Sequence, residues 1–279
     1  MPGASGKCHD LRRAMRVAKQ NTMNLASLLR QFHAGTSTHH IAIPASWHQG
    51  RTAYGGLSSV LAYQAAKLAD TDMPPLQSAQ IAFVGPLAGE VEVKATVLRR
   101  GKNTAFVKAE ISGSDGLGLS CTFIFMNRRH SHLDYEALVR PEFPPIPSAE
   151  TARSGPPEYF TGHMQYPDKR LELGMATSRL ASWHRFTEHE GLDHIAELIC
   201  IGDALPPSAM GLMTEKGIVS SMNWQINMLT DAPATTDGWW YLQSETHHAG
   251  NGASSQYMTA WNSDGQPVLT GMQSVAIFV

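Results

Sequence analysis

A single carboxylate stands in a stretch of apolar and small residues. Asp203 lies within Leu198 to Leu212, LICIGDALPPSAMGL, and is the only charged residue there. Removing a charged carboxylate from water is costly unless it is hydrogen-bonded or its pKa shifts, so a chain that keeps one there often has a use for it. The position therefore suggests general acid–base chemistry. The simpler alternative is that Asp203 only caps the turn at Pro206-Pro207.

The elements around Asp203 are expected to place it between a helix and a sheet. Apolar residues favour a buried helix from Asp193 to about Ala204. A strand that contains Trp183 is expected before it, at Arg179 to Phe186. The strands expected after it are Ile218 to Leu229, Trp239 to Glu245, Ser254 to Trp261 and Pro267 to Phe278.

The first half of the chain shows the same order of elements. A short helix is predicted within Met23 to Phe32, and a mostly buried helix within Arg51 to Ala69, entered through Gly55-Gly56. Strands with a period of two follow at Glu90 to Val97, Ala105 to Ile111 and Leu119 to Met126. The first half is therefore predicted to be one buried helix followed by antiparallel strands.

The spacing of turn residues indicates an internal repeat. Gly101 precedes Asp115 by 14 residues (115 − 101), and Gly250 precedes Asp264 by 14 (264 − 250). Agreement in order and spacing favours a duplication. In this comparison Tyr54-Gly55-Gly56 is matched to Ile201-Gly202-Asp203, so the first half is expected to lack the acid.

A proline-rich segment separates the two halves. Six prolines fall between Arg140 and Pro157: Pro141, Pro144, Pro145, Pro147, Pro156 and Pro157. Such a density suits an extended connector. The predicted organisation is an N-terminal extension at 1–22, a first unit at 23–128, a linker at 129–158 and a second unit at 159–279.

Composition excludes several classes of function. A net charge of −2 argues against a nucleic acid partner. The three cysteines are scattered without CxxC spacing, so neither a disulfide framework nor a zinc cluster is indicated, and a reduced cytoplasm fits best. His189 and His194 are five residues apart and do not match a metalloprotease helix, so no metal is expected. No apolar run reaches the roughly 18 residues of a membrane span.

Several short motifs occur in an order that resembles a known family. They are GGLSSVLAYQAA, LQSAQIAFVGPLAGEVEVKATVLRRGKNTAFVKAEI, IGDALPP, DGWWYL, WNSDGQPV and GMQSVAIF. Together they resemble the acyl-CoA thioesterase II branch of the hotdog superfamily, over roughly residues 23–279. The resemblance implies an α+β fold of two tandem hotdog units, each a central helix wrapped by an antiparallel sheet, forming a pseudo-dimer. Further association into a homo-oligomer stays open.

The resemblance also implies a catalytic site. The family holds a water between an Asp, a Thr and a Gln, which carry over onto Asp203, Ser221 and Gln273. Ser221 departs from the pattern because serine replaces threonine; it keeps the hydroxyl and loses the methyl. The alignment also allows Ser220 or Asn223 in that place.

The implied reaction is hydrolysis of an acyl-CoA thioester by direct attack of water, with coenzyme A as part of the substrate and no other cofactor. Asp203 is expected to act as general base, and backbone N–H groups near Gly56 or Asp203 to stabilise the oxyanion. Tyr54, Gly55 and Gly56 are predicted to contact substrate, although the glycines could equally serve close packing of helix and sheet.

Trp239 and Arg99 complete the predicted binding residues. Trp239 is most simply a core ring at the start of a strand, and lining an acyl tunnel is the alternative. Arg99, at a turn, is predicted to contact a coenzyme A phosphate, while a solvated turn charge is the default.

Two other classes of function compete with the hydrolase. One is an acyl or acyl-CoA binding module that keeps the fold without the chemistry, which the serine at 221 makes worth considering. The other is a hotdog hydratase, which needs a catalytic Asp and His pair. Asp203 has no histidine nearby in sequence.

Overall fold

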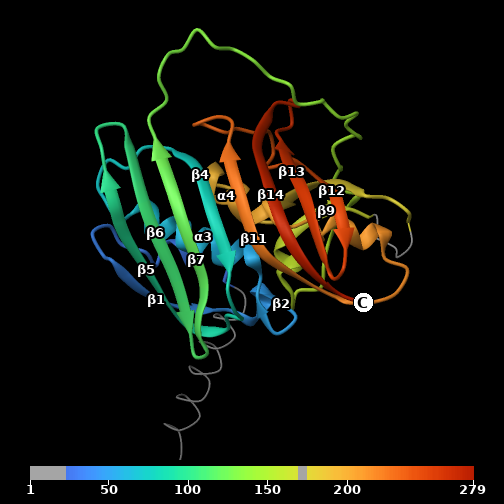
Figure 1. Ribbon diagram of the computed structural model, residues 1–279, viewed down its shortest axis with the longest axis horizontal. Helices are drawn as coiled ribbons and strands as arrows, with labels where there is room; N and C mark the ends of the chain where they lie inside the picture. The colour runs from blue at the N-terminus through green and yellow to red at the C-terminus, as the bar shows by residue number, and fades with distance from the viewer. Residues whose placement is uncertain (1–22, 169–174) are drawn as a thin grey trace, which may run out of the picture.

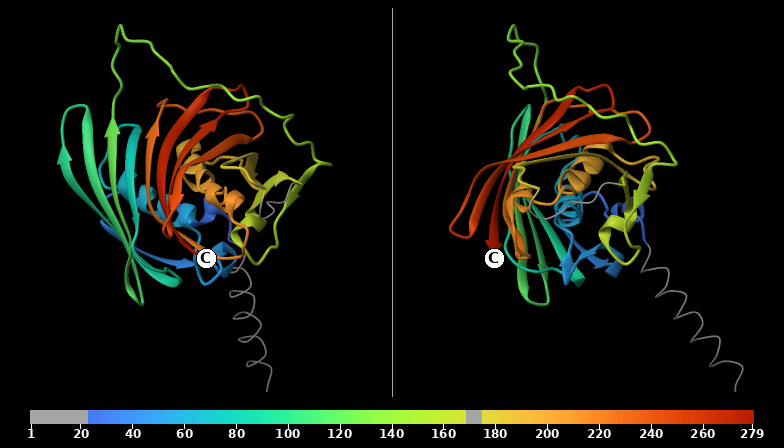
Figure 2. Two further views of the ribbon diagram at one scale, coloured as in Figure 1. Left: turned by 45° about the vertical axis from the view of Figure 1, so that its right-hand side comes forward. Right: turned by 90° about the vertical axis from the view of Figure 1, so that its right-hand side faces the viewer.

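One curved antiparallel sheet carries the whole fold and wraps two helices on one of its faces (Figures 1 and 2). The structure is a computed structural model that describes residues 23–168 and 175–279. Its main sheet has 12 strands in the order β1-β5-β6-β7-β4-β11-β14-β13-β12-β10-β9-β8. The predicted extension at 1–22 lies outside the described residues.

The elements of the first half are α2 (Leu25–Leu29), β1 (Thr38–Ile43), η1 (Ala45–Trp47), β2 (His48–Gln49), β3 (Thr52–Ala53), α3 (Gly55–Lys67), β4 (Leu76–Phe83), β5 (Gly89–Arg100), β6 (Thr104–Gly113) and β7 (Gly116–Met126). Those that follow are β8 (Ala152–Ser154), η2 (Phe160–His163), β9 (Met164–Pro167), β10 (Arg179–Phe186), α4 (His194–Gly202), η3 (Ser208–Leu212), β11 (Ile218–Met228), β12 (Trp240–Gly250), β13 (Ala253–Trp261) and β14 (Pro267–Phe278).

The two halves repeat one strand order. The series β1-β5-β6-β7-β4 in the first half corresponds to β10-β12-β13-β14-β11 in the second. The halves join edge to edge through β4 and β11, where Ala79 pairs with Ile226. Helices α3 and α4 pack against each other on the same face of the sheet (Figure 2). The duplication predicted from turn spacing therefore has a counterpart in the topology.

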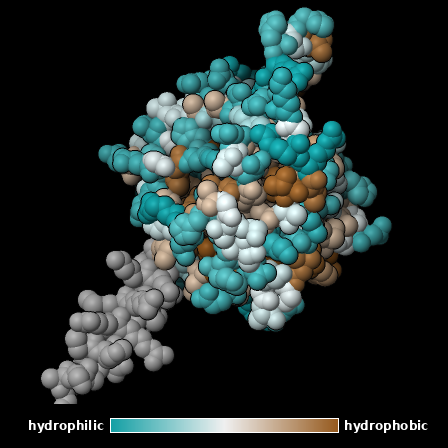
Figure 3. Space-filling model, turned by 90° about the vertical axis from the view of Figure 1, so that its left-hand side faces the viewer, coloured by the Kyte–Doolittle hydropathy of each residue, from teal (hydrophilic) through white to brown (hydrophobic). Residues whose placement is uncertain are grey.

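The alternation of buried and exposed residues along the strands explains which face of the sheet packs against the helices. In β5, Val91, Val93 and Ala95 are buried while Glu92 and Lys94 are exposed. A strand with this period presents one apolar face, which here packs against α3. Helix α3 is buried on nearly every side, as expected for a helix covered by a sheet and a second helix. Outward-facing residues make the side of the molecule in Figure 3 mainly hydrophilic, with hydrophobic residues in smaller patches.

The repeat holds for the turns but was wrongly matched at the helices. Gly101 and Asp115 lie in the turns that join β5 to β6 and β6 to β7, as the spacing predicted. However, Gly55-Gly56 opens α3, whereas Gly202 and Asp203 end α4. The position equivalent to Asp203 is Leu68, which directly follows the last residue of α3 and has nearly the same backbone angles. The predicted match between Gly55-Gly56 and Gly202-Asp203 was wrong because it paired the start of one helix with the end of the other.

The predicted linker contains a strand. Residues 127–151 form neither helix nor strand, which agrees with an extended connector. Within the predicted range 129–158, however, β8 pairs with β9 and extends the sheet edge. Within the described ranges, no helix is long and apolar enough to cross a membrane.

Candidate active site

Asp203 lies where the end of α4 meets the start of α3. It follows the last helical residue of α4, and its Oδ1 accepts a hydrogen bond from Gln273 Nε2 of β14 at 3.0 Å. The backbone N–H of Gly56 also donates to the carboxylate. A Cβ atom on Gly55 would lie 2.6 Å from Asp203 Oδ2, so only glycine leaves room for the acid here. The side chain therefore bonds to two other elements and does more than cap its own turn.

The surroundings of Asp203 change its protonation. Burial raises the pKa of its carboxyl to about 7, although the hydrogen bonds from Gln273 and Gly56 oppose the shift. Tyr54 and Cys200 lie near it, and burial raises the pKa of both groups well above their usual values, so both are neutral. Near neutral pH Asp203 consequently exchanges a proton readily, which is what a general base requires.

A cavity of about 390 Å³ opens beside the acid. The residues that line it are Gln49, Thr52, Ala53, Gly55, Ser58, Phe83, Val84, Gly85, Pro86, Leu87, Gly118, Leu119, Asp203, Pro207, Val219, Ser220 and Ser221. Among these, Asp203 is the only charged group. The cavity thus combines one ionisable acid with hydroxyl groups and apolar walls.

Ser221 reaches this cavity from β11. It precedes a β-bulge, where the pairing with β14 shifts between Ser221 and Asn223. Ser220 lines the same cavity, whereas Asn223 is exposed and its Oδ1 accepts from the backbone of Ser274. Of the three residues that the alignment allows, Ser220 and Ser221 share a cavity with Asp203 and Asn223 does not. The role of Ser221 in catalysis stays a prediction.

Gln273 is held by a residue that sequence reasoning missed. Its side chain is 2% exposed, and its Oε1 accepts from Gln256 Nε2 of β13 at 2.7 Å. The available signal was a glutamine at an inward position of an alternating strand, next to the inward Met258 and Ala260. A buried amide at such a position needs partners, which marks it as part of a polar network.

Tyr54 is placed inside the core. It is fully buried, its hydroxyl donates to the carbonyl of Cys200 at 2.7 Å, and its ring stacks on Phe160. These contacts tie the start of α3 to α4. Tyr54 is not among the cavity-lining residues, and its predicted contact with substrate stays a prediction.

Trp239 and Arg99 are not brought to the acid. Trp239 is buried in a separate cluster with Trp183 and Trp261, and Arg185 lies over its ring at 4.6 Å, which agrees with the simpler interpretation as a core ring. Arg99 is exposed at the far end of β5, ten residues beyond Gly89 (99 − 89). That is roughly 33 Å at the rise of an extended strand. Substrate binding by either residue stays a prediction that the geometry does not favour.

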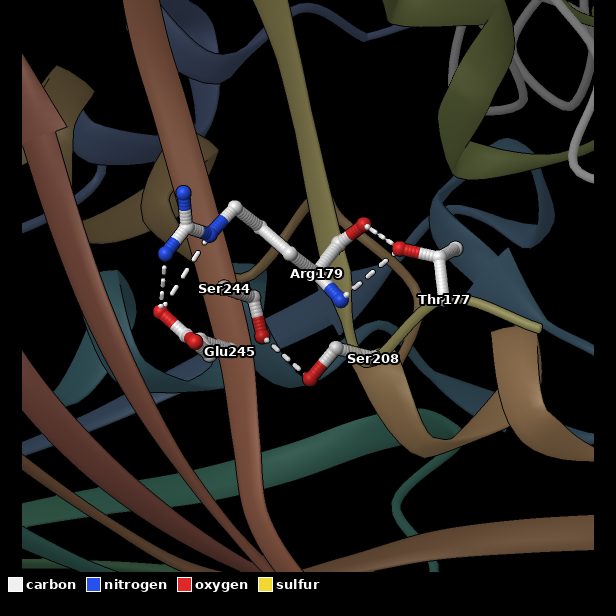
Figure 4. Close-up of polar contacts among 5 residues, drawn as sticks. All are labelled: Thr177, Arg179, Ser208, Ser244 and Glu245. Atoms are coloured by element: carbon white, nitrogen blue, oxygen red, sulfur yellow. Dashed lines mark hydrogen bonds and ion pairs between the residues drawn. The ribbon is translucent and has the colours of Figure 1, made fainter. Parts of the chain in front are cut away.

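A second cavity, of about 260 Å³, lies on the other side of the loop that follows Asp203. Ala204, Leu205 and Pro206 line it together with Phe160, Thr161, Met164, Tyr166, Met175, Arg179, Leu180, Ala181, Ser182 and His184. Arg179 pairs with Glu245 at 2.8 Å (Figure 4). Burial lowers the pKa of His184 to about 4, so its ring is neutral. The cavity suits an apolar group.

Among the described residues, neither a histidine partner for Asp203 in its cavity nor a metal-binding cluster is found. No histidine occurs among the described residues around Asp203 in its cavity, so the Asp and His pair of a hydratase is missing there. Over residues 23–168 and 175–279, no group of His, Cys, Asp and Glu is arranged to hold a metal ion.

Known structures define the class of fold. A conserved protein of unknown function with a hotdog fold from Alicyclobacillus acidocaldarius is similar, with a TM-score of 0.75, 15% identity, and coverage of 94% of this chain and 97% of that chain. An acyl-CoA thioesterase II, TesB2, from Mycobacterium marinum gives a TM-score of 0.68, 13% identity, and coverage of 90% and 96%. The fold is a hotdog fold.

Sequence models define the family. The acyl-CoA thioesterase N-terminal domain matches residues 43–126, and the acyl-CoA thioesterase C-terminal domain matches residues 136–277. The chain therefore belongs to the acyl-CoA thioesterase family. No curated protein matches it in sequence.

Proposed function

We propose that this protein hydrolyses acyl-CoA thioesters by direct attack of water, with Asp203 as the general base. The observation that carries the proposal is a carboxylate with a pKa near 7 that lines a cavity and is held by Gln273. Such a group is matched to removing a proton from water at neutral pH. Family membership supports the substrate class.

The other roles follow from the neighbours of Asp203. Ser221 would hold the attacking water with Asp203 and Gln273. Gly55 lines the cavity at the start of α3, where unpaired N–H groups and the helix dipole favour an oxyanion. Gly56 already donates its N–H to Asp203, so it serves the base. The apolar cavity beside Leu205 offers a place for the acyl chain.

The arrangement of the two halves suggests a pseudo-dimer of hotdog units with one acid site per chain. The repeated strand order and the β4–β11 junction support this proposal. At the opposite ends of the helices, the place equivalent to the acid site holds an ion pair between Lys67 and Asp193. In that pair the charge of Lys67 balances the carboxylate of Asp193, so we place the reaction only at Asp203.

A panel of acyl-CoA substrates tests the function. Purified protein is expected to release free coenzyme A thiol from at least one member, measured with a thiol reagent, while a matched acyl-CoA analogue with an amide in place of the thioester releases none. Binding of acyl-CoA by calorimetry without any thiol release would instead support the non-catalytic binding module.

The rate of hydrolysis is expected to depend on pH through Asp203. Because the base must be ionised, kcat/KM should rise with pH and level off above a midpoint near 7. An ordinary aspartate would give a midpoint near 4. The check is a pH–rate profile between pH 5 and 9, and a midpoint below about 5 would contradict the assignment of Asp203.

Replacing Ser221 tests the hydroxyl. The Ser221→Ala variant should lose about 10- to 100-fold in kcat, because one hydrogen bond to the water is lost, whereas Ser221→Thr should stay within a few fold of wild type. The matched control is Ser220→Ala, which changes the neighbouring hydroxyl. If Ser220→Ala causes the larger loss, the role belongs to Ser220.

A further inference from the structure

We propose that Gln256 is a positioning residue that orients the Gln273 amide so that its NH₂ group faces Asp203. The orientation is set by the backbone N–H of Ser208, at the opposite end of a chain of hydrogen bonds. The inference deepens the proposed function and rests on it for its kinetic consequence, whereas the orientation itself does not depend on any activity.

The chain begins at a group whose hydrogen-bonding role is fixed. A backbone N–H can only donate, and the N–H of Ser208, at the start of η3, donates to Gln256 Oε1 at 2.9 Å. The Ser208 hydroxyl donates to the same oxygen at 3.2 Å. With its oxygen facing two donors, the amide of Gln256 has one orientation, and its NH₂ must point the other way.

The orientation of the Gln256 amide fixes the orientation of the Gln273 amide. Gln256 Nε2 donates to Gln273 Oε1 at 2.7 Å, so Gln273 turns its oxygen toward β13. Its NH₂ then faces Asp203 Oδ1 at 3.0 Å. Reversing either amide would place two acceptors or two donors against each other in the interior, which is costly.

Buried hydroxyls hold the far end of this chain. Ser244 Oγ, from β12, donates to Ser208 Oγ at 3.1 Å, as Figure 4 shows. Ser208 Oγ lies 2.7 Å from Thr246 Oγ1. Ser208 and Ser244 have no exposed surface, Gln256 is 1% exposed, and Gln273 is 2% exposed. With little access to water, the bonds within the chain are the partners that decide the orientation.

The orientation of the Gln273 amide matters because it decides whether a hydrogen-bond donor or an acceptor faces the Asp203 carboxylate. A donor favours the ionised carboxylate, whereas an acceptor favours the protonated acid. The titratable groups that interact electrostatically with Asp203 are Tyr54 and Cys200, and neither carries a charge at neutral pH. The Gly56 N–H and the hydroxyls of Ser220 and Ser221 in the same cavity are neutral as well. The Gln273 amide donates a side-chain hydrogen bond to Asp203, so its orientation biases the base.

The test replaces Gln256 with methionine, which has a similar shape and no amide. The Gln256→Met variant leaves the Gln273 amide free to turn. The pH–rate midpoint should move up by about one unit. The kcat at pH 7 should fall about fivefold, because the ionised fraction of Asp203 drops from about a half to about a tenth, and KM should change less than about threefold. The matched control is Gln225→Met, at an exposed position of β11, which should leave both values unchanged.

A second measurement, by NMR, tests the inference without relying on activity, and its wild-type part needs no variant. In wild-type protein labelled with ¹⁵N-glutamine and ¹³C-aspartate, the Gln273 NH₂ signals should shift with the same midpoint as the Asp203 carboxyl. In Gln256→Met the carboxyl midpoint should rise. If wild type releases no thiol but these shifts occur, the orientation stands and the proposed function fails. An unchanged Asp203 midpoint in Gln256→Met, or Gln273 signals that ignore the titration, would overturn the inference.

Discussion

The Asp203→Asn variant is expected to hydrolyse its best acyl-CoA at least about a thousandfold more slowly than wild type. Asparagine keeps the size of the side chain and cannot accept a proton from water, so the general base is lost. The measurement is kcat from thiol release at pH 8, where Asp203 is ionised in wild type. Asp115→Asn, at an exposed turn, is the matched control and should keep full activity.

The same substitution should stabilise the fold at neutral pH. Because the pKa of Asp203 is raised on folding, the wild-type protein loses stability as pH rises from about 4 to about 7, while the unfolded chain is already ionised. Asp203→Asn removes this loss. Since the side chain is partly exposed, we expect a gain of about 1–3 kcal/mol in the free energy of unfolding at pH 8, and none below pH 4.

Urea denaturation at pH 4 and pH 8 measures this difference. A variant that is both inactive and more stable at pH 8 would show that the acid is kept for chemistry at a cost to the fold. Full activity of Asp203→Asn would refute the proposed base. A free energy of unfolding equal to that of wild type at both pH 4 and pH 8 would refute the raised pKa of Asp203.

The Gly56→Ala variant is expected to lose about 3 kcal/mol of stability, because its Cβ has no space. That atom would lie 2.2 Å from the carbonyl oxygen of Cys200 and 2.6 Å from the Tyr54 ring. The carbonyl is backbone of α4, so the two helices would have to move apart. A urea midpoint within the equivalent of 1 kcal/mol of wild type would show that α3 and α4 are less tightly packed.

Gly55→Ala is the matched comparison, one residue earlier on the same helix. Its Cβ would meet the Asp203 carboxylate at 2.6 Å and the Phe83 ring at 3.0 Å, and both are side chains. Side chains can shift at less cost than backbone, so Gly55→Ala should lose less stability than Gly56→Ala. Since the displaced group is the proposed base, it should still lose most of its activity. Similar stability losses in both variants would contradict this division.

Much of the fold was readable from local patterns. The period of two in the strands, such as Val91 to Ala95, requires one buried face, and the turn residues at Gly101 and Asp115 lie where the sheet reverses. The isolated acid at 203 is likewise a local signal, since a carboxylate among apolar residues is costly wherever it occurs. The role predicted for Gln273, by contrast, rested on the resemblance to a family and not on a local pattern.

The sequence by itself thus determined the two repeated units, their strands and the position of one unusual acid, because burial and turn geometry act over a few neighbouring residues. Only the tertiary structure decided what that acid touches. Gly56 and Asp203 meet because the start of one helix packs against the end of another, which corrected the predicted match between them. Gln256 and Ser208 orient the site from elements 48 residues apart. Hydrogen bonds between packed elements depend on where those elements lie in space, and local sequence carries no record of that.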